Sequence, residues 1–242
     1  MRADAIIFDK DGTLLDFDAY WVSVSDAAIT SVLTEYGAPL SLKEKILLAF
    51  GIENGMTYPD GILCRGTYEE MGDTVFEILK SHGCAISRDE AINSVICAYN
   101  ASADFGEIKP TCDNLISALT ALRESGIRLA VVTTDNPKIT EKCLKGLGIY
   151  GLFDEIYTDD GIHPTKPDPS AAAEFLKRYG IKKERTFMVG DTETDAKFAK
   201  NAEISFIGIA KSDTGKALLA SSADFLIEKI SELPLLINGG KL

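Results

Sequence analysis

Short apolar runs alternate with helix-like stretches throughout the part of the chain that follows Glu107. The runs Ala130-Val131-Val132 and Phe187-Met188-Val189 are apolar at every position, as strands buried on both faces of a sheet are. This alternation predicts an α/β fold, with a Rossmann-like parallel sheet covered by helices. The expected strands are 128–134, 155–158, 186–191, 205–210 and a weaker 224–227, and the expected helices are 112–125, 137–146, 169–179, 194–201 and 230–237.

The segment between residues 16 and 106 has a different pattern. Helical periodicity runs through 20–36, 42–50, 68–82 and 88–103, with Ser87 as a suitable N-cap for the last of these helices. No convincing strand lies among them, so we expect an all-helical subdomain inserted after the first strand. The predicted division is a core domain of residues 1–15 and 107–242, and a helical insert of residues 16–106.

Two aspartates follow the first expected strand directly. The apolar run 6–8 leads into Asp9 and Asp11, and Gly12 then begins a turn. Residues two apart along an extended segment point the same way, so the two carboxylates can converge on one site. Neighbouring carboxylates repel each other and lose hydration unless a cation or a proton neutralises them. Taken alone, the pair is compatible with a solvated acidic turn or with a site that holds a cation or a proton.

Three further polar segments lie at expected strand ends or before a helix. They are Thr133-Thr134-Asp135-Asn136, Lys166-Pro167 and Gly190-Asp191-Thr192-Glu193-Thr194-Asp195. Ligands of parallel sheets bind beyond the carboxyl ends of the strands, where Asp9, Thr133 and Asp191 are expected to lie. The segments offer carboxylates, hydroxyl groups and an ammonium, a set that suits a phosphoryl group held beside Mg²⁺.

These segments resemble the four motifs of haloacid-dehalogenase-superfamily phosphatases, with phosphoglycolate-phosphatase-like members closest in pattern. The matching residues, in order, are Asp9-x-Asp11-Gly12-Thr13, Thr133, Lys166-Pro167 and Gly190-Asp191-x-x-x-Asp195. The resemblance covers nearly the whole core, and it implies that the insert is a helical cap. Two positions depart from the usual pattern: Lys10 replaces an aliphatic residue, and Thr134 replaces a frequent asparagine.

The resemblance implies a catalytic role for four of these residues. Asp9 corresponds to the nucleophile that becomes an aspartyl-phosphate. Asp11 corresponds to the general acid that protonates the leaving alkoxide and then to the base that activates water. Thr133 and Lys166 correspond to groups that bind phosphoryl oxygens, with Thr134 as a further candidate for phosphate binding.

The resemblance also implies a Mg²⁺ site. Asp9, the main-chain carbonyl of Asp11, and Asp191 correspond to the metal ligands. Asp195 corresponds to a residue that acts on the metal through water or a neighbouring ligand.

Charge and composition narrow the choice of partners. The chain of 242 residues has 37 acidic and 25 basic residues, a formal net charge of −12, and shows no basic stripe that a nucleic-acid partner would need. No apolar stretch reaches the roughly 18 residues that span a bilayer, and no secretory segment is recognisable. Five widely spaced cysteines without a Cys-x-x-Cys pair predict reduced thiols and a cytoplasmic protein. His82 and His163 are interpreted as surface residues.

The leading interpretation is a Mg²⁺-dependent phosphatase that hydrolyses a small phosphorylated metabolite through an aspartyl-phosphate. Phosphoglycolate, another sugar or organic-acid phosphate, and pyrophosphate all remain open as substrates. A sugar-phosphate mutase of the β-phosphoglucomutase type is an alternative within the same superfamily. A signalling receiver domain and a phosphate-binding protein without catalysis are two further alternatives. A receiver is disfavoured because it carries its phosphorylated aspartate after a later strand and has no large insert.

Overall fold

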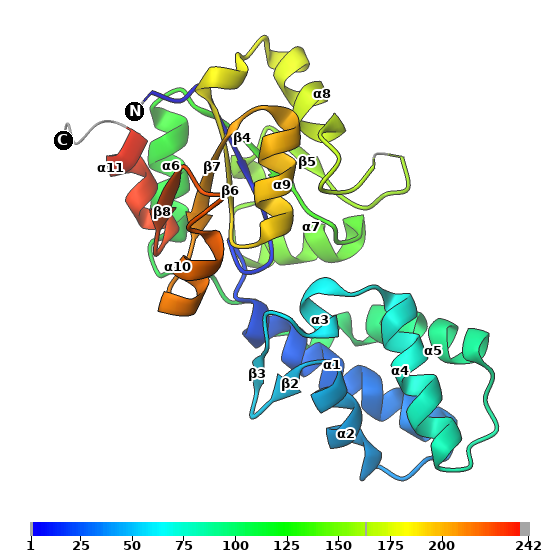
Figure 1. Ribbon diagram of the computed structural model, residues 1–242. Coiled ribbons are helices and arrows are strands. Elements are labelled where there is room, and N and C mark those ends of the chain that lie inside the picture. Colours follow the sequence, from blue (N-terminus) through cyan, green and yellow to red (C-terminus); the bar gives the residue numbers. More distant parts are fainter. Residues whose placement is uncertain (1, 163, 238–242) are drawn as a thin grey trace. The chain divides into compact units, whose positions relative to one another are not determined.

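The computed structural model describes residues 2–162 and 164–237, so His163 lies outside the described residues. Its main sheet has six parallel strands in the order β5-β4-β1-β6-β7-β8 (Figure 1). The strands are β1 (Ala5–Phe8), β4 (Arg128–Val132), β5 (Glu155–Tyr157), β6 (Thr186–Gly190), β7 (Ser205–Ile209) and β8 (Phe225–Ile227). The strand that comes first in the sequence, β1, therefore lies between β4 and β6 in the middle of the sheet.

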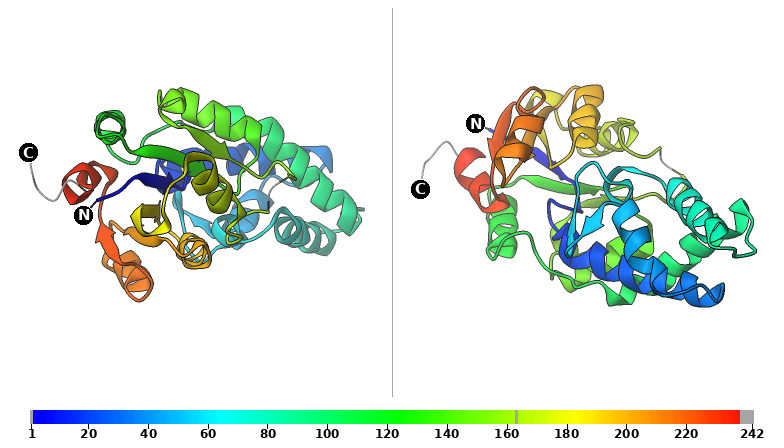
Figure 2. Two further views of the ribbon diagram at one scale, coloured as in Figure 1. Left: turned by 90° about the horizontal axis from the view of Figure 1, so that it is seen from above. Right: turned by 60° about the horizontal axis from the view of Figure 1, so that its bottom comes forward.

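Helices cover both faces of this sheet. They are α6 (Leu115–Glu124), α7 (Pro137–Gly146), α8 (Ser170–Tyr179), α9 (Glu193–Ala202), α10 (Asp213–Leu219) and α11 (Leu233–Ile237), with 3-10 turns at Tyr150–Leu152, Lys183–Arg185 and Ile230–Glu232. The chain moves outward from β1 through β4 to β5 and then returns to β6 and β7, so right-handed crossovers place α6 and α7 opposite α8 and α9 (Figure 2). Ile6, Ile7 and Phe8 are completely buried in the middle of the sheet.

The α/β fold class predicted from the sequence is confirmed. Each of the five strands expected after residue 107 is present with its ends within two residues of the prediction, and 137–146 is helical at its predicted bounds. The sequence does not predict α10. Of its residues only Leu219 is buried, so no apolar stripe marks it as a helix.

The chain divides into two compact units, residues 1–16 with 108–242, and residues 17–107. The second unit contains α1 (Phe17–Glu35), α2 (Leu42–Ala49), α3 (Ile62–Arg65), α4 (Tyr68–Ser81), α5 (Arg88–Ser102) and a 3-10 turn at Ala103–Phe105. Its helices α4 and α5 begin with capping boxes, Thr67 with Glu70 and Ser87 with Glu90, which confirms Ser87 as an N-cap. None of the described helices combines the length and the apolar character that crossing a bilayer requires.

The second unit also contains a small antiparallel pair that the all-helical prediction lacks. Strands β2 (Ile52–Glu53) and β3 (Met56–Thr57) are joined by Asn54 and Gly55, both with positive φ, at 53° and 76°. Asn-Gly is the preferred sequence for a two-residue hairpin turn that needs positive φ at both positions. The signal was therefore present in the sequence, but two-residue strands carry too little periodicity to be recognised as strands.

Candidate active site

Three of the predicted residues immediately follow neighbouring strands: Asp9 follows β1, Thr133 follows β4, and Asp191 follows β6. The backbone N–H of Asp9 donates to the carbonyl of Val189 at 2.9 Å, and that of Thr133 donates to the carbonyl of Tyr157 at 3.0 Å. The strand pairing thus continues one residue beyond β1 and β4. As a result, the start of each loop is fixed by the sheet at its carboxyl edge.

Lys166 connects the loop before α8 to this edge. Its ammonium donates to Asp9 Oδ1 at 2.5 Å and to Asp195 Oδ1 at 2.7 Å, and the Lys166 residue is only 7% exposed. A buried ammonium is tolerated only when it is paired with opposite charge and hydrogen-bonded. The two carboxylates meet that requirement, and Lys166 is thereby fixed beside the side chain of Asp9.

Asp195 is held rigidly in the first turn of α9. Its Oδ2 accepts hydrogen bonds from the backbone N–H of Thr192 at 3.1 Å and from the Thr192 hydroxyl at 2.6 Å, and its own N–H donates to that hydroxyl. A Cβ added to Gly190 would lie 2.4 Å from the carboxyl carbon of Asp195, so the backbone there must lack a side chain. Thr192 holds one oxygen of Asp195 in place, and the other oxygen accepts from Lys166. Asp195 therefore orients the ammonium of Lys166.

Asp191 lies against the turn that follows β1. Its Oδ1 accepts a hydrogen bond from the Thr13 hydroxyl at 2.8 Å. Gly12 has a φ of +81°, and a Cβ there would lie 2.2 Å from Asp191 Oδ2. The glycine is therefore required twice, for its backbone conformation and for the space that the carboxylate occupies.

The site has an excess of negative charge. Burial raises the pKa of Asp9 to about 7, with Asp195 and Asp11 adding repulsion and Lys166 opposing it. Burial likewise raises the pKa of Asp191 well above its usual range. Burial lowers the pKa of Lys166, but attraction to Asp195 and Asp9 outweighs this and raises it above the usual value. The single ammonium of Lys166 thus leaves carboxylate charge that a further cation would neutralise.

The carboxylates suit a hard divalent cation. Asp9, Asp191 and Asp195 each offer an oxygen, and these atoms lie within 4.8 Å of one another. Mg²⁺ binds oxygen atoms at about 2.0–2.1 Å, so opposite ligands lie about 4 Å apart. Because Asp195 already accepts hydrogen bonds at both oxygens, Asp9 and Asp191 are the better direct ligands. Oxygen donors, burial and unbalanced charge together fit such an ion.

Asp11 faces a different partner. Its two oxygens lie 2.7 Å from the ammonium of Lys10, and the same ammonium lies 3.1 Å from Asp135 Oδ2. Lys10 is completely buried, whereas the side chain of Asp11 is 18% exposed. Asp9 and Asp11 belong to one loop, but Asp9 pairs with Lys166 whereas Asp11 pairs with Lys10.

The two threonines after β4 differ. Thr133 is 3% exposed, and its Oγ1 accepts a hydrogen bond from the N–H of Asp135 at 3.2 Å. Thr134 is exposed, and among the described residues its hydroxyl makes no recorded hydrogen bond. The structure therefore fixes the hydroxyl of Thr133 in the loop and leaves that of Thr134 in solvent.

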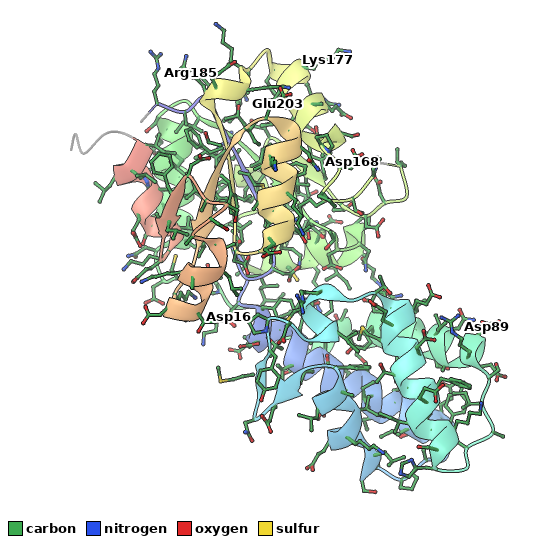
Figure 3. All side chains as sticks on the ribbon, viewed as in Figure 1. Asp16, Asp89, Asp168, Lys177, Arg185 and Glu203 are labelled. Atoms are coloured by element: carbon green, nitrogen blue, oxygen red, sulfur yellow. The ribbon has the colours of Figure 1, made fainter. Side chains whose placement is uncertain are left out.

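The segment before α8 is shaped by Asp168, which Figure 3 labels. Its carboxylate accepts hydrogen bonds from the backbone N–H of Ser170 at 2.9 Å and from the Ser170 hydroxyl, and these hold the pKa of Asp168 below its usual range. This local turn lies two residues after Lys166, so it helps to define where α8 begins and how the preceding loop enters it.

Three residues with clear roles in this geometry had no role in the sequence-based prediction: Thr13, Asp135 and Lys10 as a partner of Asp11. Thr13 belongs to the first motif, so its proximity to Asp191 had a sequence signal. Asp135 follows the second motif by two residues, yet no sequence pattern links it to Lys10. That pairing depends on how the loops after β1 and β4 fold against each other.

Comparison with known proteins gives a consistent assignment. A family model described as haloacid dehalogenase-like hydrolase matches residues 3–203. The chain is 28% identical to a pyrophosphatase PpaX of Bacillus velezensis, over 99% of this chain and 98% of the relative. It is 28% identical to a phosphoglycolate phosphatase of Vibrio parahaemolyticus, over 94% and 93% of the two chains. A crystal structure of a predicted phosphoglycolate phosphatase from Haemophilus somnus, 19% identical, covers 98% of both chains with a TM-score of 0.70 and shares the fold.

Proposed function

The chain belongs to the haloacid dehalogenase-like hydrolases, and we propose that it is a Mg²⁺-dependent phosphatase that forms an aspartyl-phosphate on Asp9. Relatives named as phosphatases support the general activity, the hydrolysis of phosphate esters. The observation that carries the more specific proposal is the contact between Asp9 Oδ1 and the ammonium of Lys166 at 2.5 Å. This contact engages one oxygen of Asp9 and leaves the other to form the bond to phosphorus.

In the first step, a carboxylate oxygen of Asp9 forms a bond to phosphorus while the bond from phosphorus to the leaving oxygen breaks. Asp11 donates its proton to that oxygen, so the product leaves as an alcohol. In the second step, Asp11 takes a proton from water, and the water oxygen attacks phosphorus and displaces the Asp9 carboxylate. The result is inorganic phosphate and the original enzyme.

The residues that would hold Mg²⁺ are Asp9, Asp191 and the main-chain carbonyl of Asp11. When bound there, the ion supplies positive charge that offsets repulsion between the carboxylates and the phosphoryl oxygens. Asp195 fixes the Lys166 ammonium by accepting a hydrogen bond from it at 2.7 Å, and this holds the ammonium beside Asp9. Thr13 orients Asp191 through its hydroxyl.

The proposed phosphate contacts are the ammonium of Lys166 and the hydroxyl of Thr133, with Thr134 as a weaker candidate because it is exposed. The proposed substrate is a small phosphorylated metabolite, such as phosphoglycolate or a related organic-acid or sugar phosphate. Relatives named as pyrophosphatase and phosphoglycolate phosphatase support a small substrate. We also propose that the predicted insert, residues 16–106, acts as the cap that selects among such substrates.

The test is a screen of phosphate release from a panel of phosphometabolites, including phosphoglycolate and pyrophosphate, with and without Mg²⁺. The variant Asp9→Asn is compared with Asp213→Asn, the same substitution at an exposed residue of α10. We expect metal-dependent release that D9N abolishes and D213N retains. Wild-type turnover by folded D9N would rule out Asp9 as the nucleophile. Interconversion of a sugar phosphate with little phosphate release would identify a mutase instead.

A cytoplasmic location is part of the proposal. All five cysteines are free in the structure, as expected in a reducing compartment. Fractionation of cells that express the protein tests this, and recovery outside the cytoplasmic fraction would contradict it.

A further inference from the structure

The strongest observation outside the proposed catalytic steps is the complete burial of Lys10. Its ammonium lies 2.7 Å from both oxygens of Asp11 and 3.1 Å from Asp135 Oδ2. Burying a charged lysine is unfavourable unless paired charges compensate for the lost hydration. The buried charge of Lys10 therefore depends on the carboxylates of both Asp11 and Asp135 for compensation.

The ammonium joins two loops of the site. Asp11 belongs to the loop after β1, Asp135 belongs to the loop after β4, and these two strands are neighbours in the sheet. Lys166 pairs with Asp9 and Asp195 instead, so the printed ion pairs of the two lysines share no carboxylate. Lys10 and Lys166 thus organise separate carboxylates.

Asp135 is itself firmly held. Its N–H donates to Thr133 Oγ1 at 3.2 Å, and its Oδ1 accepts from the N–H of Asn136 at 2.9 Å. Asn136 in turn caps α7 by accepting a hydrogen bond from the N–H of Ile139 at 3.0 Å. The chain of contacts runs from a helix terminus through Asp135 and Lys10 to Asp11.

We propose that Lys10, anchored by Asp135, is a positioning residue that orients the carboxylate of Asp11 for proton transfer. This inference rests on the proposed function, in which Asp11 protonates the leaving oxygen. A proton donor acts only when it lies within about 2.6–3.2 Å of the oxygen that receives the proton. The side chain of Asp11 is partly exposed, so the symmetric contact with Lys10 restricts the orientations that it would otherwise sample.

Substrates whose leaving groups differ in their need for a proton distinguish this positioning role from a purely structural one. An alkoxide needs a proton as its bond to phosphorus breaks, whereas p-nitrophenolate leaves without one. If Lys10 acts through Asp11, then Lys10→Met lowers kcat/KM for an alkyl phosphate more than for p-nitrophenyl phosphate. General damage to the fold would lower both values by the same factor.

The experiment compares phosphoglycolate with p-nitrophenyl phosphate in the wild type, K10M and Lys216→Met. Lys216 pairs with Glu228 on the exposed side of α10, so K216M is the same substitution away from the site. For K10M we expect a loss of about 30-fold or more with phosphoglycolate, a part of the roughly 10²–10⁴-fold that general acid catalysis contributes, and of about threefold or less with p-nitrophenyl phosphate. K216M should match the wild type with both.

A double-mutant cycle shows whether Lys10 acts through Asp11. In an Asp11→Asn background, adding K10M should change kcat/KM for phosphoglycolate by less than about twofold, since coupled residues are not additive. An equal loss in both backgrounds overturns the inference. Asp135→Asn removes one of the two negative charges that face Lys10 and keeps the side-chain volume, so it carries the test if K10M fails to fold. This variant should also lose more kcat/KM with phosphoglycolate than with p-nitrophenyl phosphate. Equal losses with the two substrates would overturn the inference.

Crystal structures of the wild type and K10M provide a readout that needs no activity. We expect the Asp11 carboxylate to turn in K10M while Asp9, Lys166 and Asp195 keep their contacts. An unchanged Asp11 would overturn the inference. The proposed function fails separately, through a wild type inactive on the whole panel or through an active D9N.

Discussion

Replacing Gly12 with alanine tests how the loop after β1 shapes the proposed metal-binding end of the site. Gly12 has a φ of +81°, a conformation that destabilises an L-residue by about 1–2 kcal/mol. The new Cβ would also lie 2.2 Å from Asp191 Oδ2, whereas Cβ contacts below 3.0 Å are essentially never observed. The difference, 3.0 minus 2.2, means that the loop or the carboxylate must move by at least 0.8 Å.

A second glycine provides the matched control. Gly180 ends α8 with a φ of +64°, and a Cβ there would meet no atom within 4 Å. Gly180→Ala therefore carries the conformational penalty without a collision. We expect each variant to lose about 1–2 kcal/mol of unfolding free energy from the backbone alone, with a larger loss for G12A because Asp191 is displaced.

The two variants should differ most in metal binding. Displacing a ligand or its support typically weakens metal affinity by about 10–100-fold, so G12A should need that much more Mg²⁺ for half-maximal activity. Urea unfolding gives the stabilities, and Mg²⁺ titration of both phosphatase activity and thermal stability gives the affinities. If G12A had the same Mg²⁺ affinity as G180A, the packing of Asp191 against Gly12 would not control the cation.

Three further predictions follow from the charges and caps of the site. Lys166→Met leaves Asp9 and Asp195 without their buried ammonium, so the unfolding free energy measured in urea should fall by about 3–5 kcal/mol, and turnover should be lost. An unchanged unfolding free energy would contradict the buried pairing. Thr192→Ala removes the hydroxyl that caps α9, so unfolding free energy should fall by about 0.5–2 kcal/mol, and an unchanged value would exclude the capping contribution. Metal-free protein should lose stability as pH rises from about 4 towards 7, because burial raises the pKa of Asp9 from its ordinary value of 3.8 to about 7 and folding then favours the protonated form. Mg²⁺ should accordingly raise the melting temperature more near pH 8 than near pH 5.5, and the pH dependence should be weaker in D9N; an equal metal effect at both pH values would count against a carboxylate site.

The parts of the fold that were predictable have strong local signals. Strands β4 and β6 are apolar at successive positions because both faces of the sheet are covered, and α7 begins with Asn136 as N-cap and Pro137 in its first turn. Such features depend on neighbouring residues alone. The hairpin at Asn54 and Gly55 and the exposed α10 have short or weak patterns, so periodicity could not reveal them.

That the candidate residues lie close together was predictable to a similar extent. Parallel strands bring their carboxyl ends to one edge, which indicated that Asp9, Thr133 and Asp191 lie there, and the resemblance to the four motifs added Lys166. The pairing of Lys10 with Asp11 and Asp135 was not predictable, because it depends on the conformation of two loops. A lysine between two aspartates also suggests an exposed residue, whereas the structure buries it completely.

The most direct test of the account is to trap the phosphoryl group on the enzyme. The protein is mixed with a rapidly hydrolysed phosphate ester and Mg²⁺, quenched in acid within one turnover, digested and analysed by mass spectrometry. We predict an acid-stable acyl-phosphate on the peptide that carries Asp9, absent from D9N and lost when the wild type is allowed to complete turnover. A phosphoryl group on any other residue would contradict the proposed role of Asp9. So would rapid turnover without any acyl-phosphate on Asp9, even in Asp11→Asn, which should slow hydrolysis of that intermediate.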